Sequence, residues 1–474
     1  MKPIFFKELK SYTIEYLSKK LEIDNEYMDE LIKNLIERKL ISKNKDKTIS
    51  FKYVGIIIYN EKVLFIFPKY IDKNDDELDL PEFKQILKLL KEYSKIERLD
   101  SEEIETLGLD LEDQFTNTVS LVVYILDNYI ENNIYYNEIV TDEYNGEGEI
   151  LWDKTVDNID PFIINGQVIY LDFITKLNIL NDSSLITNVH KFIVNECIEF
   201  MSNTGLDLYL GYNLDKIDCD LDNIKDSEFI INKLEREMQI QFNDNKINMI
   251  KSMISFINNS LSKTEGDNIQ LFGTRKFYIV WEKLCSRVFK NEFESTGNKS
   301  KYDKFYINPP TWENSKKQDI SIDESDEIST KKNRLTPDIL KTCEHNDKKY
   351  LLILDAKYYN IVFRNNTVEY NPGIADISKQ YLYKLALDKY IKENTINKIE
   401  NIFLFPTSDK DNLMGYVSLD FIKSYSKSEK NIKSDNDDNE EKIKLVKLNV
   451  ENLIELYCKK EYININQIFE ILCT

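Results

Sequence analysis

Two aspartates and a lysine lie in this sequence with the spacing of a metal-dependent hydrolytic site. Pro337-Asp338 opens an apolar stretch, a polar turn follows, and the apolar segment Tyr350–Leu354 runs directly into Asp355-Ala356-Lys357. This pattern predicts an antiparallel hairpin that brings both carboxylates to one end. Because side chains alternate along a strand, Asp355 and Lys357 should share one face. Two adjacent carboxylates suit Mg²⁺, which prefers oxygen ligands and keeps several waters.

Such a set of residues suits hydrolysis of a phosphodiester, a poor electrophile shielded by negative charge. A divalent cation polarises the phosphoryl oxygen and lowers the pKa of bound water, and a nearby lysine can orient the nucleophile. A helix predicted over residues 276–289 places Glu282 as a third acid. A later helix, predicted over residues 377–387, offers Gln380 and Tyr383 on one face.

An acid-x-Lys triplet alone is not specific, because Asp244–Lys246, Asp347–Lys349 and Glu440–Lys442 also fit it. None of these follows an apolar strand with a Pro-Asp one hairpin upstream. The alternative interpretation is an exposed strand end with an ordinary salt bridge. The strand placement and the flanking helices favour the catalytic interpretation.

The composition excludes several other classes. Only two histidines are present, so a multi-His zinc site is excluded, and His190 is expected to pack or cap a helix. No Gly-x-x-x-x-Gly-Lys-Ser/Thr motif occurs, so this chain should bind no nucleotide and a partner would supply nucleotide energy. No apolar run reaches the roughly 18 residues of a membrane span. With no signal peptide and six scattered cysteines, we expect a reduced, cytoplasmic protein without membrane contact.

The charge is uneven along the 474 residues. The chain has 63 Lys+Arg against 83 Asp+Glu, a net charge of −20, but residues 101–160 hold 16 acidic residues and one basic residue. DNA contact at either end is therefore not excluded, since the local field decides phosphate binding. The acidic segment either docks a basic partner or is a solvated surface.

Three parts are predicted along the chain. Residues 1–50 show two short helices and a hairpin, typical of a winged helix that contacts DNA or of a small protein-binding module. Residues 51–265 form a mixed α+β middle domain for partner or DNA engagement, with strands expected at 150–152 and 168–171 and helices from about residue 190. Residues 266–474 form an α/β domain with polar insertions at 291–333 and 426–441.

Several motifs match known families. Leu354–Tyr359, with Thr336-Pro337-Asp338 before it and Lys379-Gln380 after it, resembles the PD-(D/E)XK nuclease superfamily. The segment from Phe272-Gly273-Thr274 to Cys285 resembles the LlaJI-type restriction endonucleases, relatives of the McrC nuclease subunit. Similar likenesses are carried by Val54–Ile57 with Pro68-Lys69-Tyr70, and by Trp152–Thr155 with Asn188–Lys191. The resemblance covers most of the chain.

The resemblance implies an α/β and α+β multidomain protein whose C-terminal part is a PD-(D/E)XK nuclease core, a mixed sheet flanked by helices. It implies a Mg²⁺-dependent endonuclease that cuts double-stranded DNA in an antiviral restriction system, together with a McrB-like AAA+ GTPase. The roles it implies are metal ligation by Asp338, Asp355 and the Ala356 carbonyl, orientation of water by Lys357 as base, a further metal-site acid at Glu282, and positioning by Gln380.

Other outcomes stay open on the sequence alone. Mn²⁺ could substitute for Mg²⁺, and the chain could form a homodimer. One alternative is a self-sufficient repair or mobile-element nuclease, and another is a non-cleaving adaptor that binds DNA or a partner. The presence of Asp338, Asp355, Lys357 and Glu282 argues against loss of the site.

Overall fold

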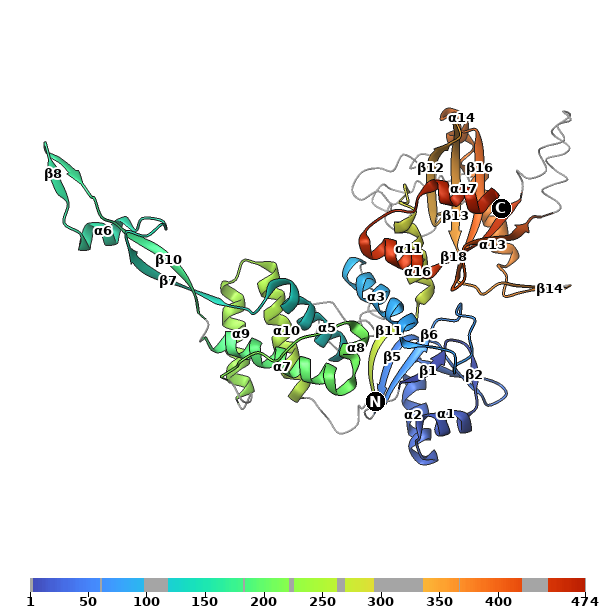
Figure 1. Ribbon diagram of the computed structural model, residues 1–474, viewed down its shortest axis with the longest axis horizontal. Coiled ribbons are helices and arrows are strands. Elements are labelled where there is room, and N and C mark those ends of the chain that lie inside the picture. The colour runs from blue at the N-terminus through green and yellow to red at the C-terminus, as the bar shows by residue number, and fades with distance from the viewer. Residues whose placement is uncertain are drawn as a thin grey trace, which may run out of the picture. The chain divides into compact units, whose positions relative to one another are not determined.

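The computed structural model describes residues 3–59, 62–97, 118–181, 184–220, 226–261, 269–293, 336–365, 367–419 and 442–473 (Figure 1). The chain forms two compact units. The first unit comprises Ile57–Val63 and Leu99–Phe272, and the second comprises Pro3–Ile56, Leu64–Arg98 and Gly273–Thr474. The predicted division at residues 50 and 265 stays a prediction. Apart from residues 291–293, the two predicted insertions lie outside the described residues, as do residues 101–117 of the acidic segment.

A five-stranded mixed sheet forms the centre of the second unit, with strand order β12-β13-β16-β18-β17. β12 (Ile339–His345) and β13 (Lys348–Ala356) form an antiparallel hairpin. β13, β16 (Lys398–Thr407) and β18 (Ile443–Asn449) run parallel, and β17 (Asn412–Val417) closes the edge antiparallel to β18. The residues from Leu351 to Ala356 are all buried, as expected for a central strand covered on both faces.

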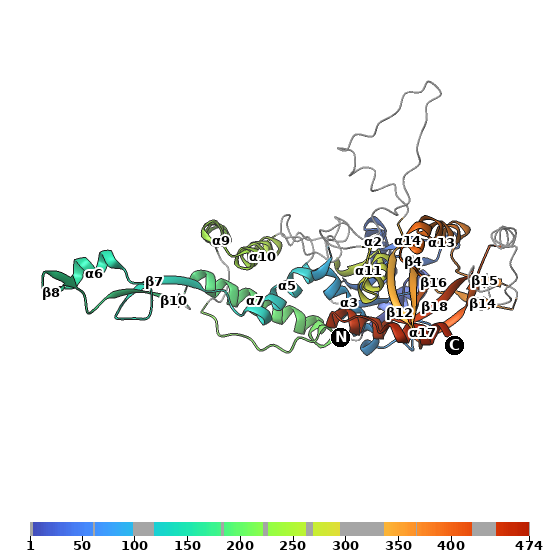
Figure 2. The ribbon, with the colours of Figure 1, turned by 90° about the horizontal axis from the view of Figure 1, so that it is seen from above.

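Helices lie on both sides of this sheet (Figure 2). α13 (Ile374–Ala386) and α14 (Asp388–Glu393) pack on the face formed by Leu340, Leu351 and Ile353. α11 (Phe277–Val288) and α16 (Val450–Lys459) pack on each other; α11 also packs on β13, and α16 packs on β18. α3 (Leu80–Ile96) packs on α16. α17 (Ile465–Cys473) packs on β17. A short hairpin joins β14 (Val362–Arg364) to β15 (Thr367–Glu369). The architecture is thus mixed α/β.

The N-terminal residues form two helices and a small sheet. α1 (Ile14–Leu21) and α2 (Asn25–Glu37) precede a three-stranded sheet of β2 (Ser11–Tyr12), β4 (Ile49–Phe51) and β3 (Ile41–Lys43). The expected helices and hairpin are present, whereas their winged-helix identity stays a prediction. A separate sheet has the order β1 (Ile4–Lys7), β6 (Lys62–Phe67), β5 (Val54–Tyr59) and β11 (Ile269–Thr274).

Helices and a long arm make up most of the first unit. The helices are α5 (Thr118–Asn132), α7 (Leu185–Thr204), α8 (Leu206–Leu210), α9 (Ser227–Ile240) and α10 (Asp244–Leu261). The arm pairs β7 (Asn137–Tyr144) with β10 (Ile174–Asn181) and carries α6 (Trp152–Asn158) and the hairpin of β8 (Phe162–Ile164) and β9 (Gln167–Ile169). Among the described residues, no helix is both long and apolar enough to cross a membrane.

One predicted strand of the arm is wrong. Residues 150–152 were expected to form a strand, but Trp152 begins α6, and Ile150 makes only an isolated bridge to Thr175. Three consecutive apolar residues have no period that separates a strand from a helix. The strand expected at 168–171 corresponds to β9, which is shorter and starts one residue earlier.

Candidate active site

The hairpin of β12 and β13 places Asp338 opposite Asp355. Ile339 pairs with Leu354, so the two aspartates are the next facing residues of the antiparallel ladder. The Ala356 N–H donates a hydrogen bond to Asp338 Oδ2 at 2.9 Å. In an extended strand the N–H and C=O of one residue project to the same side. The Ala356 carbonyl therefore points to the side on which Asp338 lies.

Lys357 lies among carboxylates. Its Nζ is 2.9 Å from Asp355 Oδ2 and 3.3 Å from Asp376 Oδ1. Its backbone N–H donates to Leu404 O at 2.8 Å, which continues the pairing of β13 with β16 by one residue. Burial lowers the pKa of Lys357, but the charges of Asp355, Asp338 and Asp376 outweigh burial, and the net pKa lies above the ordinary value. The lysine is therefore a cation that donates hydrogen bonds.

Negative charge is crowded at this strand end. Asp355 is only 5% exposed. Burial raises the pKa of Asp338 well above its ordinary range, and the charge and hydrogen bond of Asp355, followed by the charge of Glu282, raise it further. One lysine does not balance these carboxylates, so a bound cation would be favourable here.

Glu282 reaches the same site from α11. Burial raises the pKa of its carboxyl, with the charge of Lys357 lowering it and that of Asp355 raising it, so all three groups interact. The fully buried Trp281 donates from Nε1 to Leu404 O at 3.3 Å. That carbonyl also accepts from Lys357, so α11 and the strand end share one anchor.

Gln380 lies on α13, on a helix face that it shares with Asp376 and Tyr383. Its side chain is fully buried, and neither amide atom has a hydrogen-bond partner in the described part of the chain. Tyr383 donates from its hydroxyl to Thr336 O at 2.9 Å, next to the Pro-Asp segment. Sequence reasoning missed Asp376, although its position one turn before Gln380 was an available signal.

The donor set fits Mg²⁺. Within the described ranges, no group of three or more His, Cys, Asp and Glu side chains is arranged to hold a metal ion. Mg²⁺ is usually held by one or two carboxylates and completes its shell with water and substrate phosphate. Asp338, Asp355 and the Ala356 carbonyl provide such a set, and the burial and the neighbouring carboxylates that raise the pKa of Asp338 are what a bound cation would offset.

Neither histidine belongs to this cluster. His345 lies at the far end of β12, where its ring stacks on Phe469 at 4.3 Å. His190 is buried on α7 and accepts a hydrogen bond at Nδ1 from the Tyr135 N–H at 2.8 Å. Burial lowers its pKa to about 4, so its ring is neutral.

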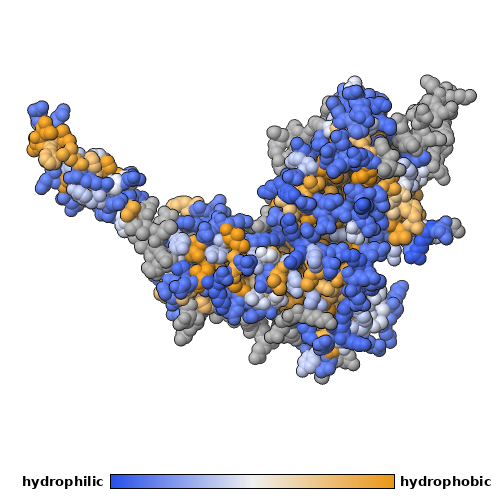
Figure 3. All heavy atoms as spheres, viewed as in Figure 1, coloured by the Kyte–Doolittle hydropathy of each residue, from blue (hydrophilic) through white to orange (hydrophobic). Residues whose placement is uncertain are grey.

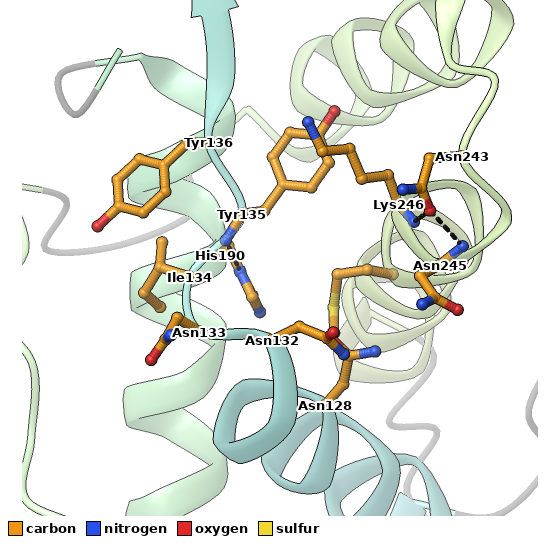
Figure 4. A pocket seen from close by; sticks show the side chains of 11 residues that line it. Asn128, Asn132, Asn133, Ile134, Tyr135, Tyr136, His190, Asn243, Asn245 and Lys246 are labelled. Atoms are coloured by element: carbon orange, nitrogen blue, oxygen red, sulfur yellow. Dashed lines mark hydrogen bonds between the residues drawn. The ribbon is translucent and has the colours of Figure 1, made fainter. Parts of the chain in front are cut away.

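His190 also lines a pocket of about 320 Å³ in the first unit. Figure 4 shows its ring between α5, which carries Asn128 and Asn132, and the start of α10, which carries Lys246. The His190 Nε2 is buried and has no hydrogen-bond partner in the described part of the chain, so its packing or capping role stays a prediction.

Comparison with known proteins indicates which class of protein this chain belongs to. The chain is 31% identical over 392 residues to the type II restriction enzyme BsuMI component YdjA of Bacillus subtilis (strain 168), covering 81% of this chain and 78% of that protein. A McrC chain bound to McrB AAA+ hexamers of Thermococcus gammatolerans is a distant structural likeness, with TM-score 0.38, 13% identity, and coverage of 98% of this chain and 100% of that chain. The sequence relative thus places this chain among the restriction enzymes.

The family follows from the sequence match. Residues 53–451 match the LlaJI restriction endonuclease family, and this chain belongs to that family. The resemblance to the LlaJI-type restriction endonucleases drawn from the motifs is therefore confirmed.

Proposed function

We propose that this chain is a Mg²⁺-dependent endonuclease that hydrolyses phosphodiester bonds of double-stranded DNA in the cytoplasm, with its site at Asp338, Asp355 and Lys357. The observation that carries the proposal is the facing carboxylate pair, with Lys357 Nζ 2.9 Å from Asp355, in a chain of a restriction endonuclease family. The PD-(D/E)XK assignment of this mixed sheet rests on the same arrangement.

Each residue has a defined part in this proposal. Asp338, Asp355 and the Ala356 carbonyl would hold Mg²⁺, or Mn²⁺ in its place. The bound ion supplies Lewis acidity toward the phosphoryl oxygen and lowers the pKa of coordinated water. Lys357, positioned by Asp355 and Asp376, donates from Nζ and orients the attacking water.

The remaining polar groups act around that water. Glu282 is a further acid at the metal site and can accept a hydrogen bond from the water. Gln380 has two buried amide atoms without partners in the described residues, and these can bind a buried water. Because one metal site hydrolyses one phosphodiester at a time, cutting both strands favours two copies of the chain.

A AAA+ GTPase is the proposed partner. The chain has no phosphate-binding loop, and its motifs resemble those of McrC-related proteins. The arm ends in apolar side chains that are more than half exposed: Trp152, Phe162, Ile163, Ile164 and Val168. Figure 3 shows hydrophobic side chains gathered at this end. Exposed apolar patches of this kind mark protein interaction sites, so we place the partner there.

Plasmid cleavage tests the proposal. Full-length protein is incubated with Mg²⁺, alone and with a co-encoded AAA+ protein and GTP, beside Asp355→Asn and Lys357→Met. We expect cleavage only with the partner and GTP, and a loss on the order of 1000-fold in each variant, because an electrostatic group of the site is removed. Both variants should fold and bind DNA.

Each other result has a defined meaning. Cleavage by the chain alone would favour a self-sufficient nuclease. Equal inactivity of wild type and variants under every condition would favour the non-cleaving adaptor. Full cleavage by both variants would reject the site.

A further inference from the structure

Tyr358, the residue after Lys357, is buried among residues from distant parts of the chain. It is 6% exposed, and its ring lies 5.2 Å from that of Phe277 on α11 and 6.4 Å from that of Tyr70. Phe277 is on the helix that carries Glu282. The side chain following the catalytic lysine is therefore enclosed on several sides.

The hydroxyl of Tyr358 joins a hydrogen-bond network. It donates to Glu8 Oε2 at 2.5 Å. The backbone N–H of Lys69 donates to the Tyr358 hydroxyl at 3.2 Å and lies 3.3 Å from the same Glu8 oxygen. Lys69 Nζ is 4.4 Å from the centre of the Tyr358 ring, a cation–π contact. Glu8 follows β1 and Lys69 follows β6, so two N-terminal strands end at this tyrosine.

Lys357 needs such support because it lies beyond the last residue of β13. One backbone hydrogen bond, to Leu404 O, continues the ladder, and the Tyr359 N–H turns back to Lys357 O at 2.9 Å. A strand end held by one ladder bond can shift. Displacement of a catalytic group by about 1 Å can cost on the order of 100-fold in rate.

We propose that Glu8, Lys69 and Tyr358 are positioning residues that hold the end of β13 and thereby place Lys357 Nζ at the metal site. This inference rests on the proposed nuclease function. It gives a role to the Pro68-Lys69-Tyr70 motif, which the site itself does not use. The N-terminal strands are then part of the nuclease scaffold, in keeping with their place in the same compact unit.

Conservative variants test the network. Tyr358→Phe removes only the hydroxyl, Glu8→Gln replaces the carboxyl group with an amide, and the double variant combines them. Tyr212→Phe is the matched control, because Tyr212 is also buried and donates to a carboxylate, Asp127, at 2.7 Å, but belongs to the first unit. The kcat and KM for plasmid cleavage are measured with Mg²⁺, AAA+ partner and GTP, and hydrogen exchange is followed at the Lys357 amide.

We expect kcat to fall about tenfold to 100-fold in Tyr358→Phe, with KM within about twofold. The double variant should lose no more than the worse single variant, because both remove one network. Exchange at the Lys357 amide should accelerate. Tyr212→Phe should lower the thermal midpoint similarly and leave kcat unchanged, which separates positioning from stability.

Two outcomes distinguish this inference from the function it rests on. Unchanged kcat in Tyr358→Phe, with unchanged exchange at Lys357, would overturn the positioning role while the nuclease stands. If wild type does not cleave, accelerated exchange at Lys357 in Tyr358→Phe but not in Tyr212→Phe still supports the network, and equal exchange in all variants rejects it.

Discussion

At the scale of single residues, the site is a group of acids around one lysine. Asp338, Asp355, Glu282 and Asp376 all interact with Lys357 Nζ, and two of them, Asp338 and Glu282, have raised pKa values because burial disfavours their charge. The carboxylates of this cluster repel one another, and the packing of the surrounding elements keeps them close. We expect this cluster to be less stable without a bound cation, and unfolding measurements can test that.

Asp338→Asn should stabilise the metal-free protein. The amide oxygen can still accept from the Ala356 N–H, while the buried charge is removed. Relief of a strained site group commonly gains roughly 0.5–2 kcal/mol. Because the pKa of Asp338 is raised from 3.8, its contribution to stability is present at low pH and is lost as pH rises through the folded-state value. Asp338→Asn should not show this fall in stability with rising pH.

Thermal unfolding with and without Mg²⁺ provides the measurement. Mg²⁺ should raise the midpoint of wild type and have a much smaller effect on Asp338→Asn, because only the native wild type binds the ion well. An equal rise in both proteins would contradict the assignment of Asp338 as a ligand.

His190 predicts a separate acid sensitivity. Burial lowers its pKa from 6.5 to about 4, so the unfolded chain takes up a proton over a range in which the folded ring stays neutral. Stability is therefore full above about pH 6.5 and is lost as pH falls toward 4, by roughly 3 kcal/mol for the whole shift. His190→Asn, which keeps an acceptor for the Tyr135 N–H, should flatten this slope in urea unfolding between about pH 7 and about pH 5. The same dependence of stability on pH in both proteins would refute the assignment of this acid sensitivity to His190.

At the scale of elements, the close approach of β11 to β5 explains two motifs. A Cβ on Gly273 would lie 2.2 Å from the Val54 carbonyl oxygen and 2.7 Å from Gly55 Cα. Both contacts are with backbone, which cannot move aside as a flexible side chain can. The Phe272-Gly273-Thr274 and Val54-Gly55 motifs therefore depend on each other.

Gly273→Ala should be destabilising by about 1–3 kcal/mol, the usual cost of overpacking. Gly373→Ala is the matched control, because its Cβ would meet nothing within 4 Å and its φ of −74° suits alanine. Urea unfolding of both variants measures the difference. Equal stability of the two variants would show that the strands can separate without cost.

At the scale of the whole molecule, the arm offers a surface that its own unit leaves uncovered. Ile163 and Val168 face each other across the β8–β9 hairpin and are 74% and 61% exposed. The adjoining helix α6 adds Trp152, which is 53% exposed. Solvent exposure of so many apolar side chains in one place is best explained by a partner that covers them.

Replacing Ile163 and Val168 with serine should change folding stability by no more than about 0.5 kcal/mol, since both side chains are exposed. Affinity for the AAA+ partner should fall by at least about tenfold, because central apolar contacts dominate interfaces. Leu208→Ser is the control, with an exposed leucine (68%) on α8. Sedimentation of mixtures with the partner checks this, and unchanged binding would remove the arm tip as the docking surface.

The sequence alone determined the strands and helices that carry the site, because these elements depend on residues close together in the chain. The apolar runs around one polar turn predicted the hairpin of Asp338 and Asp355, and strand alternation put Lys357 beside Asp355, because hydrophobic pattern sets strand faces locally. The helices of Glu282 and Gln380 followed from their periodicity. Three features became visible only in the tertiary structure: the contact of Asp376 with Lys357, the hydrogen bond between Tyr358 and Glu8, and the exposed apolar end of the arm. These features join residues far apart in the chain, and their pairing is decided by packing and burial, which no local pattern encodes.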